Sequence, residues 1–400
     1  MRITALETIQ LESFPNIIWL EVHTDEGLVG LGETFRGAHA VAAHIHHSTA
    51  PYLLGQDPLA IDRHSAALLG GPVGFIGNGV ETRAASAVDI ALWDLFGKST
   101  GLPIHQLLGG ASRDRIPVYN TCSGYRYNSA AWKRTVDISD AREGPYDDQI
   151  GFVTAADELA LSLLDEGYTA MKIWPFDVHA EVTGGLHISV EQIREGLIPF
   201  EKIRNAVGDR MEVMAEFHGM WRLPAARQIA AALRDVRPYW LEDPIRMTSV
   251  SELAEYAAAT DIKVCASETM ATRTAFRDLL ESRAASVVML DLGWCGGLSE
   301  ARKIASAADT YQRPIAPHDC TGPIVLAASI QLGLNAPNTL YQEVVRAYLA
   351  GWYRELVEEL PKVSGGYISP VAGPGHGMTL QADLKKRPDA IVRRTDLTVL

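Results

Sequence analysis

Acidic and basic side chains recur at nearly regular intervals through the second half of the chain. They stand where apolar, β-rich runs end, and successive members lie 23 to 27 residues apart. A single charge at the end of a strand is usually solvated, but a buried charge must be paired or must bind a metal. A recurring set of such charges therefore indicates one shared chemical site. Its members are Glu216, Glu242, Glu268, Asp291, His318 and Glu343.

Three of these residues, Glu216, Glu242 and Glu268, are carboxylates from consecutive units of the repeat. Oxygen ligands with room for water suit Mg²⁺ and, less well, Mn²⁺. A zinc site would more often contain His or Cys. We therefore expect one Mg²⁺ per subunit, where it would hold a substrate carboxylate and stabilise an enediolate when the α-proton leaves.

His318 is the candidate base for removing that proton, because imidazole titrates near neutral pH. Asp291 stands one unit earlier in the chain, where it would bond the imidazole, fix its tautomer and raise its basicity. Glu343 stands one unit later and would hydrogen-bond the intermediate or orient His318.

His218 is the candidate for a second acid or base. It lies two residues after Glu216, so both side chains point to the same side of an extended strand. From there it would deliver a proton to a departing hydroxyl group. Lys172 lies near the end of an earlier predicted strand and would contact the substrate carboxylate.

The elements that must position these residues are strands alternating with helices. The eight short β-rich runs are separated by helical patterns such as 224–236 and 299–311. This alternation predicts a closed parallel barrel with its active site at the carboxyl ends of the strands. The predicted strands are 118–122, 170–174, 212–216, 239–243, 263–268, 287–291, 314–318 and 340–343.

The first third of the chain has a different pattern. Short strands are predicted at 2–13, 17–23 and 28–33, with the turn TDEG between the last two, and helices at 38–50, 58–69 and 80–99. Strands followed by helices indicate an α+β domain.

Three domain segments follow from this change of pattern. Residues 1–113 are predicted to form an α+β domain, 114–364 the (β/α) barrel, and 365–400 a segment that packs back on the first domain. Segments 124–150 and 177–190 are predicted to be active-site loops.

Composition excludes several other classes of protein. The net charge of −13, without clusters of Lys and Arg, argues against nucleic-acid binding. The four cysteines form no CxxC pair, which is typical of free thiols in a reducing compartment. We recognise no signal peptide or membrane span, so we expect a cytoplasmic protein with a small-molecule substrate. His44, His46 and His47 do not indicate a zinc site, since neighbours two apart do not share a helix face.

These residues and the sequence around them resemble the enolase superfamily, in its mandelate racemase-like branch. The resemblance covers almost the whole chain. It is carried by TDEGLVGLGE (24–33), AASAVDIALWDLFGKSTGLPIHQLLGG (84–110), MAEFHG (214–219), WLEDPI (240–245), SET (267–269), DLGWCGGLSEARKIA (291–305), APHDCTGPI (316–324) and YQE (341–343).

The resemblance implies a (β/α)7β-type barrel with an N-terminal capping domain completed by the C-terminal segment. Loops of the cap near 14–17 and 71–80 would then help to choose the substrate. Glu216, Glu242 and Glu268 match the family's metal positions, and His318 with Asp291 matches its His–Asp dyad. The family also implies a homo-oligomer, from a dimer to an octamer.

The sequence departs from the racemase pattern at two places, and the first departure points to dehydration. Lys172-Ile173-Trp174 stands where racemases carry Lys-x-Lys, so the second lysine base is missing. Phe217-His218 is similar to the motif of galactonate dehydratase-like enzymes, in which the histidine is the acid that helps water to leave. The second departure is Glu216, since Asp is the commoner ligand there, and its extra methylene should shift the metal or change its coordination.

We therefore predict an Mg²⁺-dependent dehydratase that converts an acid sugar to a 2-keto-3-deoxy acid. Two alternatives stay open: a racemase, epimerase or lactone cycloisomerase with the same site, and a sugar-acid binding protein without activity.

Overall fold

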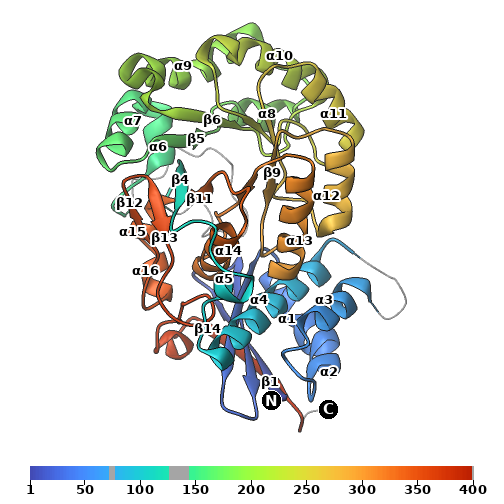
Figure 1. Cartoon of the computed structure of the whole chain (residues 1–400). Coiled ribbons are helices and arrows are strands. Elements are labelled where there is room, and N and C mark those ends of the chain that lie inside the picture. The colour runs from blue at the N-terminus through green and yellow to red at the C-terminus, as the bar shows by residue number, and fades with distance from the viewer. Residues whose placement is uncertain (72–76, 126–143, 399–400) are drawn as a thin grey trace.

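A four-stranded antiparallel sheet forms the N-terminal part of the molecule. The computed structural model describes residues 1–71, 77–125 and 144–398. Three strands of the sheet come from the N-terminal end and one from the C-terminal end, so the two ends of the chain lie close together (Figure 1). In sheet order the strands are β14 (Ala390–Asp396), β1 (Ile3–Leu11), β2 (Ile17–Thr24) and β3 (Val29–Phe35).

The long helix α4 (Val80–Thr100) packs closely against β3. A Cβ atom placed on Gly30 would lie 2.2 Å from the carbonyl oxygen of Ala91, and one on Gly32 would lie 1.9 Å from that of Ala87. Glycine is therefore required at both positions for the helix to approach the strand. The other helices of this domain are α1 (Ala38–His44), the π-helix η1 (Ile45–Thr49), α2 (Ala50–Leu53), α3 (Ile61–Gly70) and α5 (Ile104–Leu107).

Within the described residues, eight parallel strands form a barrel above this domain (Figure 1). The last strand pairs with the first, and the backbone N–H of Leu340 donates to Ile315 at 2.8 Å, which closes the ring. The predicted barrel is confirmed, and each predicted strand overlaps an observed one. The strands are β4 (Ile116–Thr121), β5 (Ala170–Ile173), β6 (Glu212–Glu216), β7 (Leu241–Glu242), β8 (Val264–Ala266), β9 (Val287–Leu290), β10 (Ile315–Pro317) and β11 (Gln342–Val344).

Helices connect the strands and cover the outside of the barrel (Figure 1). The segment 177–190, which we predicted to be a loop, begins with a helix, so that prediction is wrong for residues 177–183. The covering helices are α6 (Asp148–Thr154), α7 (Ala156–Asp165), α8 (Asp177–Thr183), α9 (Val190–Val207), α10 (Leu223–Leu233), α11 (Val250–Ala258), α12 (Thr272–Glu281), α13 (Gly297–Thr310) and α14 (Pro323–Asn335).

The end of the chain returns from the barrel to the first domain. Two short helices, α15 (Arg346–Ala350) and α16 (Tyr353–Leu356), lead to the hairpin β12 (Lys362–Ser364) and β13 (Tyr367–Ser369), whose second strand pairs antiparallel with β4. Strand β14 then pairs with β1. In the described ranges, no helix combines the length and the apolar character that crossing a bilayer requires.

A buried layer of side chains fills the inside of the barrel and forms the floor beneath the strand ends. Tyr119 and Trp240 contact each other edge to face, with ring centroids 5.3 Å apart. Because this layer is filled, polar side chains at the carboxyl ends of the strands face the capping domain rather than an open channel. The layer consists of Tyr119, Ala170, Met214, Trp240, Cys265, Val287, Met289 and Ala316.

Candidate active site

Three glutamate side chains converge at the carboxyl ends of neighbouring strands. Glu216 ends β6, Glu242 ends β7, and Glu268 follows β8. One oxygen of each carboxylate lies within 4.8 Å of the others. All three donors are carboxylate oxygens, the ligands that Mg²⁺ prefers, so these residues fit a bound divalent cation.

The balance of charge in this cluster also favours a cation. Burial and the neighbouring Glu216 raise the pKa of Glu242 well above its usual range. Burial, Glu216 and Glu268 likewise raise the pKa of Asp243, which accepts a hydrogen bond from Ser267 at 2.7 Å. Such shifts arise when like charges share a poorly solvated site. A divalent cation bound among the three glutamates would relieve this repulsion.

The Glu216 side chain folds back on the end of its own strand. Its Oε1 accepts the backbone N–H groups of Phe217 at 2.9 Å and His218 at 2.6 Å, and its Oε2 lies 3.2 Å from Nζ of Lys172. Burial opposes ionisation, but Lys172 and His218 outweigh it and lower the pKa of Glu216 to about 2. The extra methylene thus lets one oxygen bind the backbone while the other faces the cluster.

Lys172 is surrounded by carboxylates. Its Nζ is ion-paired with Glu242, with Glu216 and, at 3.0 Å, with Glu343. Burial alone would lower the pKa of this amine, but Glu242 and Glu343 outweigh burial and raise it well above its usual range. Lys172 is therefore a fixed cation rather than a proton acceptor.

Glu343 joins the lysine to the rest of the site. It accepts hydrogen bonds from Thr121 Oγ1 and, at 3.1 Å, from the backbone N–H of Asp319. Its carboxylate lies 3.9 Å from Nε2 of His318, beyond hydrogen-bonding distance. The structure thus does not place Glu343 as the residue that orients His318, one of the two roles predicted for it.

The imidazole of His318 is instead held by three other groups. Its Nδ1 lies 2.6 Å from Oδ2 of Asp291, its Nε2 lies 2.9 Å from Glu268, and its ring stacks on Trp294 with centroids 5.5 Å apart. Burial opposes protonation, but Glu268 and Glu343 outweigh it and raise the pKa of His318 well above its usual range. The expected His–Asp contact is thus present, and the remaining nitrogen faces the carboxylate cluster.

His218 has a similar partner that the sequence interpretation missed. Its Nδ1 lies 2.5 Å from Oδ2 of Asp177, and its ring meets the edge of Trp174. Burial opposes protonation, but Glu216 and Asp177 outweigh it and raise the pKa of His218 to about 9. The signal in the sequence was weak: an acidic residue in the aromatic segment Trp174-Pro-Phe-Asp177, four residues after β5 ends.

A small cavity of about 30 Å³ brings the two histidines together with the carboxylates and with the end of β3 from the capping domain. Among the buried aromatic side chains near this end of the barrel, Trp174 lines the cavity, whereas Phe176 and Trp221 do not. The lining residues are Phe35, Arg36, Thr121, Lys172, Trp174, Glu216, His218, Glu268, Trp294, His318, Cys320 and Glu343.

Two predictions about loops concern segments that the structure describes only in part. Residues 72–76, within the predicted substrate-selecting loop at 71–80, lie outside the described residues. So do residues 126–143, which make up most of the predicted active-site loop at 124–150.

His46 of the first domain has a structural role. His46 lies between β1 and β14, with its two ring nitrogens 2.8 Å from the hydroxyls of Thr8 and Thr395. These contacts occupy both ring nitrogens of His46.

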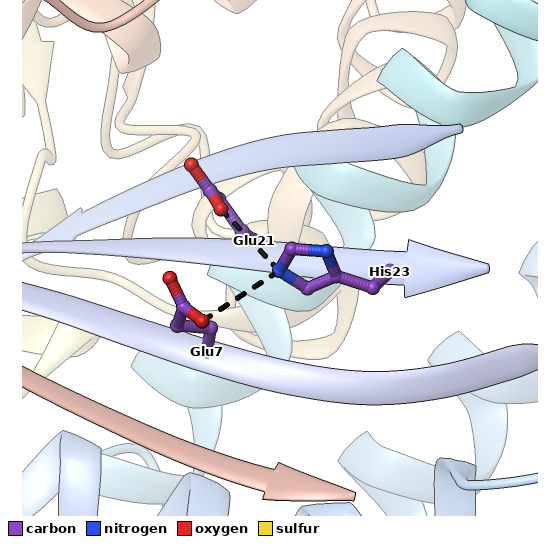
Figure 2. A group of neighbouring side chains, drawn as sticks. All are labelled: Glu7, Glu21 and His23. Carbon is purple, nitrogen blue, oxygen red and sulfur yellow. Dashed lines mark ion pairs between the residues drawn. The ribbon is translucent and has the colours of Figure 1, made fainter. Parts of the chain in front are cut away.

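A second group that could suit a metal lies on strands β1 and β2 of the first sheet. Figure 2 shows His23 directed at Glu7 and Glu21, with distances of 4.0 and 3.3 Å. Lys385 is hydrogen-bonded to both carboxylates, and Arg394 lies 3.2 Å from Glu7. The two cations balance the two carboxylates, so this group lacks the excess negative charge that the barrel site has.

The closed parallel barrel, the carboxylate cluster at its strand ends and the domain that covers it define an enzyme of the enolase type. Residues 3–109 match the mandelate racemase/muconate lactonizing enzyme N-terminal domain, and residues 155–384 match the enolase C-terminal domain-like family. The chain therefore belongs to the mandelate racemase/muconate lactonizing enzyme family of the enolase superfamily.

Relatives and solved structures agree with this assignment. The chain is 32% identical to D-xylonate dehydratase of Haloferax volcanii over 95% of this chain and 87% of that protein. It is 31% identical to D-galactonate dehydratase of Ralstonia nicotianae, over 96% and 93%. A mandelate racemase-subgroup enolase from Agrobacterium tumefaciens is 50% identical with a TM-score of 0.89, and the match covers 100% of both chains. The comparisons support a hydro-lyase, the class of carbon–oxygen lyase to which dehydratases belong.

Proposed function

We propose that this chain is an Mg²⁺-dependent acid-sugar dehydratase that forms a 2-keto-3-deoxy acid. One observation carries the proposal: two imidazoles, of His318 and His218, line the same cavity beside the carboxylate cluster. Lys172 is committed to three carboxylates and leaves the two histidines as the groups that can move protons. The dehydratase relatives support the same reaction.

In this proposal His318 removes the proton from the carbon next to the substrate carboxylate. Asp291 holds Nδ1, so Nε2 is the nitrogen that takes the proton. His218 then gives a proton to the β-hydroxyl group, the C–O bond breaks, and water leaves. The resulting enol takes up a proton from solvent at the former β-carbon, loses its hydroxyl proton to solvent and becomes the 2-keto-3-deoxy acid.

Glu216, Glu242 and Glu268 would hold the cation. When bound, it would supply positive charge to the substrate carboxylate and so stabilise the negative charge that develops there. Lys172 adds a second, permanent positive charge beside Glu216. The proposal also includes a cytoplasmic homo-oligomer, between a dimer and an octamer.

The test is to incubate the enzyme with Mg²⁺ and a set of five- and six-carbon acid sugars, and to detect 2-keto-3-deoxy products with semicarbazide. Once a substrate is found, His318→Asn should abolish both dehydration and exchange of the α-proton in D₂O. His218→Asn should abolish dehydration but keep exchange. Each loss should be at least ~10²-fold, the usual contribution of an acid or base. The exposed His187 offers a control: His187→Asn should keep wild-type rates.

Full dehydration by the His318 variant would refute this mechanism. Exchange without loss of water in the wild type would instead indicate a racemase, epimerase or lactone cycloisomerase, with His218 returning a proton to the opposite face. Metal binding without exchange on any acid would indicate a binding protein.

A further inference from the structure

We infer that Asp177 is a positioning residue that fixes His218 for the departure of water. This inference rests on the proposed function and assigns its second histidine a partner. Asp177 is the first residue of α8, and its side chain is fully buried. Its Oδ2 lies 2.5 Å from Nδ1 of His218, and within the described residues its Oδ1 has no hydrogen-bond partner. The Asp177 carboxylate therefore bonds the imidazole of His218 rather than the backbone of its own helix.

The surroundings of His218 leave its ring little freedom. The residue has a left-handed backbone, with φ of 47°, and its N–H donates to Oε1 of Glu216 at 2.6 Å. The ring meets Trp174 edge to face at 5.4 Å. A non-glycine residue in this conformation is strained and needs support from its neighbours. The contact with Asp177 supplies part of that support, because it holds the imidazole ring at the end of the His218 side chain.

The contact also decides which nitrogen can react. An ionised carboxylate only accepts hydrogen bonds, so the nitrogen facing Asp177 carries a hydrogen. The proton that His218 transfers must then leave from Nε2. Without Asp177 the imidazole could rotate or change tautomer, and the proton would no longer be aimed at the hydroxyl group.

The arrangement repeats that of His318 and Asp291. In strand order, Asp177 and His218 follow β5 and β6, whereas Asp291 and His318 follow β9 and β10. The three glutamates follow or end the strands β6, β7 and β8. Two His–Asp pairs thus flank one carboxylate cluster, and each pair holds one of the two histidines to which the proposed reaction assigns a proton transfer.

The experiment compares dehydration with α-proton exchange in D₂O, measured by NMR on the same acid sugar. Asp177→Asn should lower kcat for dehydration by ~10²- to 10³-fold, within the range for an acid catalyst, while KM changes less than about threefold. Exchange catalysed by His318 should persist. A purely structural role for Asp177 would lower exchange and dehydration together, and that result would overturn the inference.

A double mutant tests whether Asp177 acts through His218. The variant carrying both Asp177→Asn and His218→Asn should dehydrate no more slowly than His218→Asn alone. Independent, multiplying losses would contradict the inference. If Asp177→Asn does not fold, Asp177→Glu keeps the charge but displaces it by one methylene, and it should show the same selective loss of dehydration.

A matched control is the contact between α9 and the same helix, α8. Glu195 pairs with His179 of α8 at 3.5 Å, outside the cavity, so Glu195→Gln removes a similar carboxylate–imidazole contact and should leave both rates unchanged. If His218→Asn shows selective loss but Asp177→Asn matches the wild type, the inference fails and the proposed function stands. If neither reaction occurs in the wild type, the proposed function itself fails.

Discussion

At the scale of single residues, the most informative departure from the family pattern is Glu216. Its carboxylate does two things at once: Oε1 caps the backbone N–H groups of Phe217 and His218, and Oε2 faces Lys172. An aspartate is one methylene shorter and cannot span the same distance from the same Cα. The glutamate therefore links the carboxylate cluster to the backbone that carries His218.

Glu216→Asp should weaken the site without removing its charge. Because the shorter side chain must give up either the backbone N–H groups or the cluster, we expect about tenfold weaker Mg²⁺ binding, or ~1.4 kcal/mol. The measurement is calorimetric titration with Mg²⁺, supported by the Mg²⁺ dependence of kcat. Glu212→Asp, at the partly exposed start of the same strand, is the control. Unchanged Mg²⁺ affinity in Glu216→Asp would contradict this account.

The ammonium group of Lys172 compensates the negative charge of buried carboxylates. Replacing Lys172 should therefore lower the stability of the folded protein. Lys172→Met leaves Glu216, Glu242 and Glu343 without their shared cation, and breaking a buried ion pair costs ~3–5 kcal/mol. We expect a lower unfolding temperature in the absence of metal, together with a larger increase on adding Mg²⁺ than in the wild type. Equal responses to Mg²⁺ in the two proteins would show that the lysine charge is not coupled to the metal site.

At the scale of elements, the carboxyl ends of the barrel strands were predictable from sequence because they combine two signals. Each buried strand is an apolar run, and each run stops at a polar residue where the chain reaches the site. Asp177 lies outside that pattern, since it starts a helix rather than ending a strand. Helix α8 was missed for a related reason: it buries only Asp177 and Ala180, while Val178 and Val182 are exposed, so it has no apolar stripe at helical spacing.

The junction between β3 and α14 is a second element-level feature, and sequence periodicity gave no sign of it. Glu33 is buried at the N-terminus of α14, where its Oε1 accepts the backbone N–H groups of Ile324 at 3.1 Å and Val325 at 2.9 Å. Its Oε2 accepts the indole N–H of Trp19 at 2.7 Å. One carboxyl group thus ties the capping sheet to the helix that follows the His318 strand.

Glu33→Gln should destabilise the contact between β3 and α14. All three partners of Glu33 are hydrogen-bond donors, so the side-chain NH₂ group of the glutamine would face another N–H group instead of an acceptor. An unsatisfied buried donor costs ~1–3 kcal/mol. We expect a lower unfolding temperature and faster hydrogen exchange in the first turn of α14. The exposed Glu26 provides the control, since Glu26→Gln should stay within ~0.5 kcal/mol of the wild type. Wild-type exchange in α14 of Glu33→Gln would argue against a junction role.

At the scale of the whole molecule, the capping domain covers the catalytic face of the barrel and is also hydrogen-bonded to a side chain beside the proposed base. The carbonyl oxygen of Phe35 accepts hydrogen bonds from Arg83 Nε and from Trp294 Nε1, both at 3.1 Å. Trp294 in turn stacks on His318. The cap therefore reaches the proposed base through one carbonyl group and one indole. Such long-range contacts depend on three-dimensional proximity between residues about 259 apart, which no local pattern encodes.

A long-range contact of the same kind, the pairing of β14 with β1, joins the two ends of the chain. His46 makes the stability of this pairing depend on pH. Its ring nitrogens contact Thr8 of β1 and Thr395 of β14. Burial lowers the pKa of His46 to about 4, from 6.5. Between these values the unfolded chain binds more protons than the folded one, so stability is fully present above pH 6.5 and decreases as the pH falls towards 4. Allowing for partial solvation, we expect His46 to contribute ~1–3 kcal/mol to this decrease.

His46→Gln should separate this contribution from that of other groups. Glutamine can still bond both threonines but does not titrate, so the unfolding temperature of the variant should fall less steeply between pH 7 and pH 4.5 than that of the wild type. The adjacent His47 is exposed, and His47→Gln should keep the wild-type slope. If the unfolding temperatures of His46→Gln and the wild type fall equally steeply with pH, groups other than His46 cause the acid sensitivity of the fold. A shallower slope would show that the pairing of β14 with β1 is stabilised by one neutral imidazole, which contacts both strands.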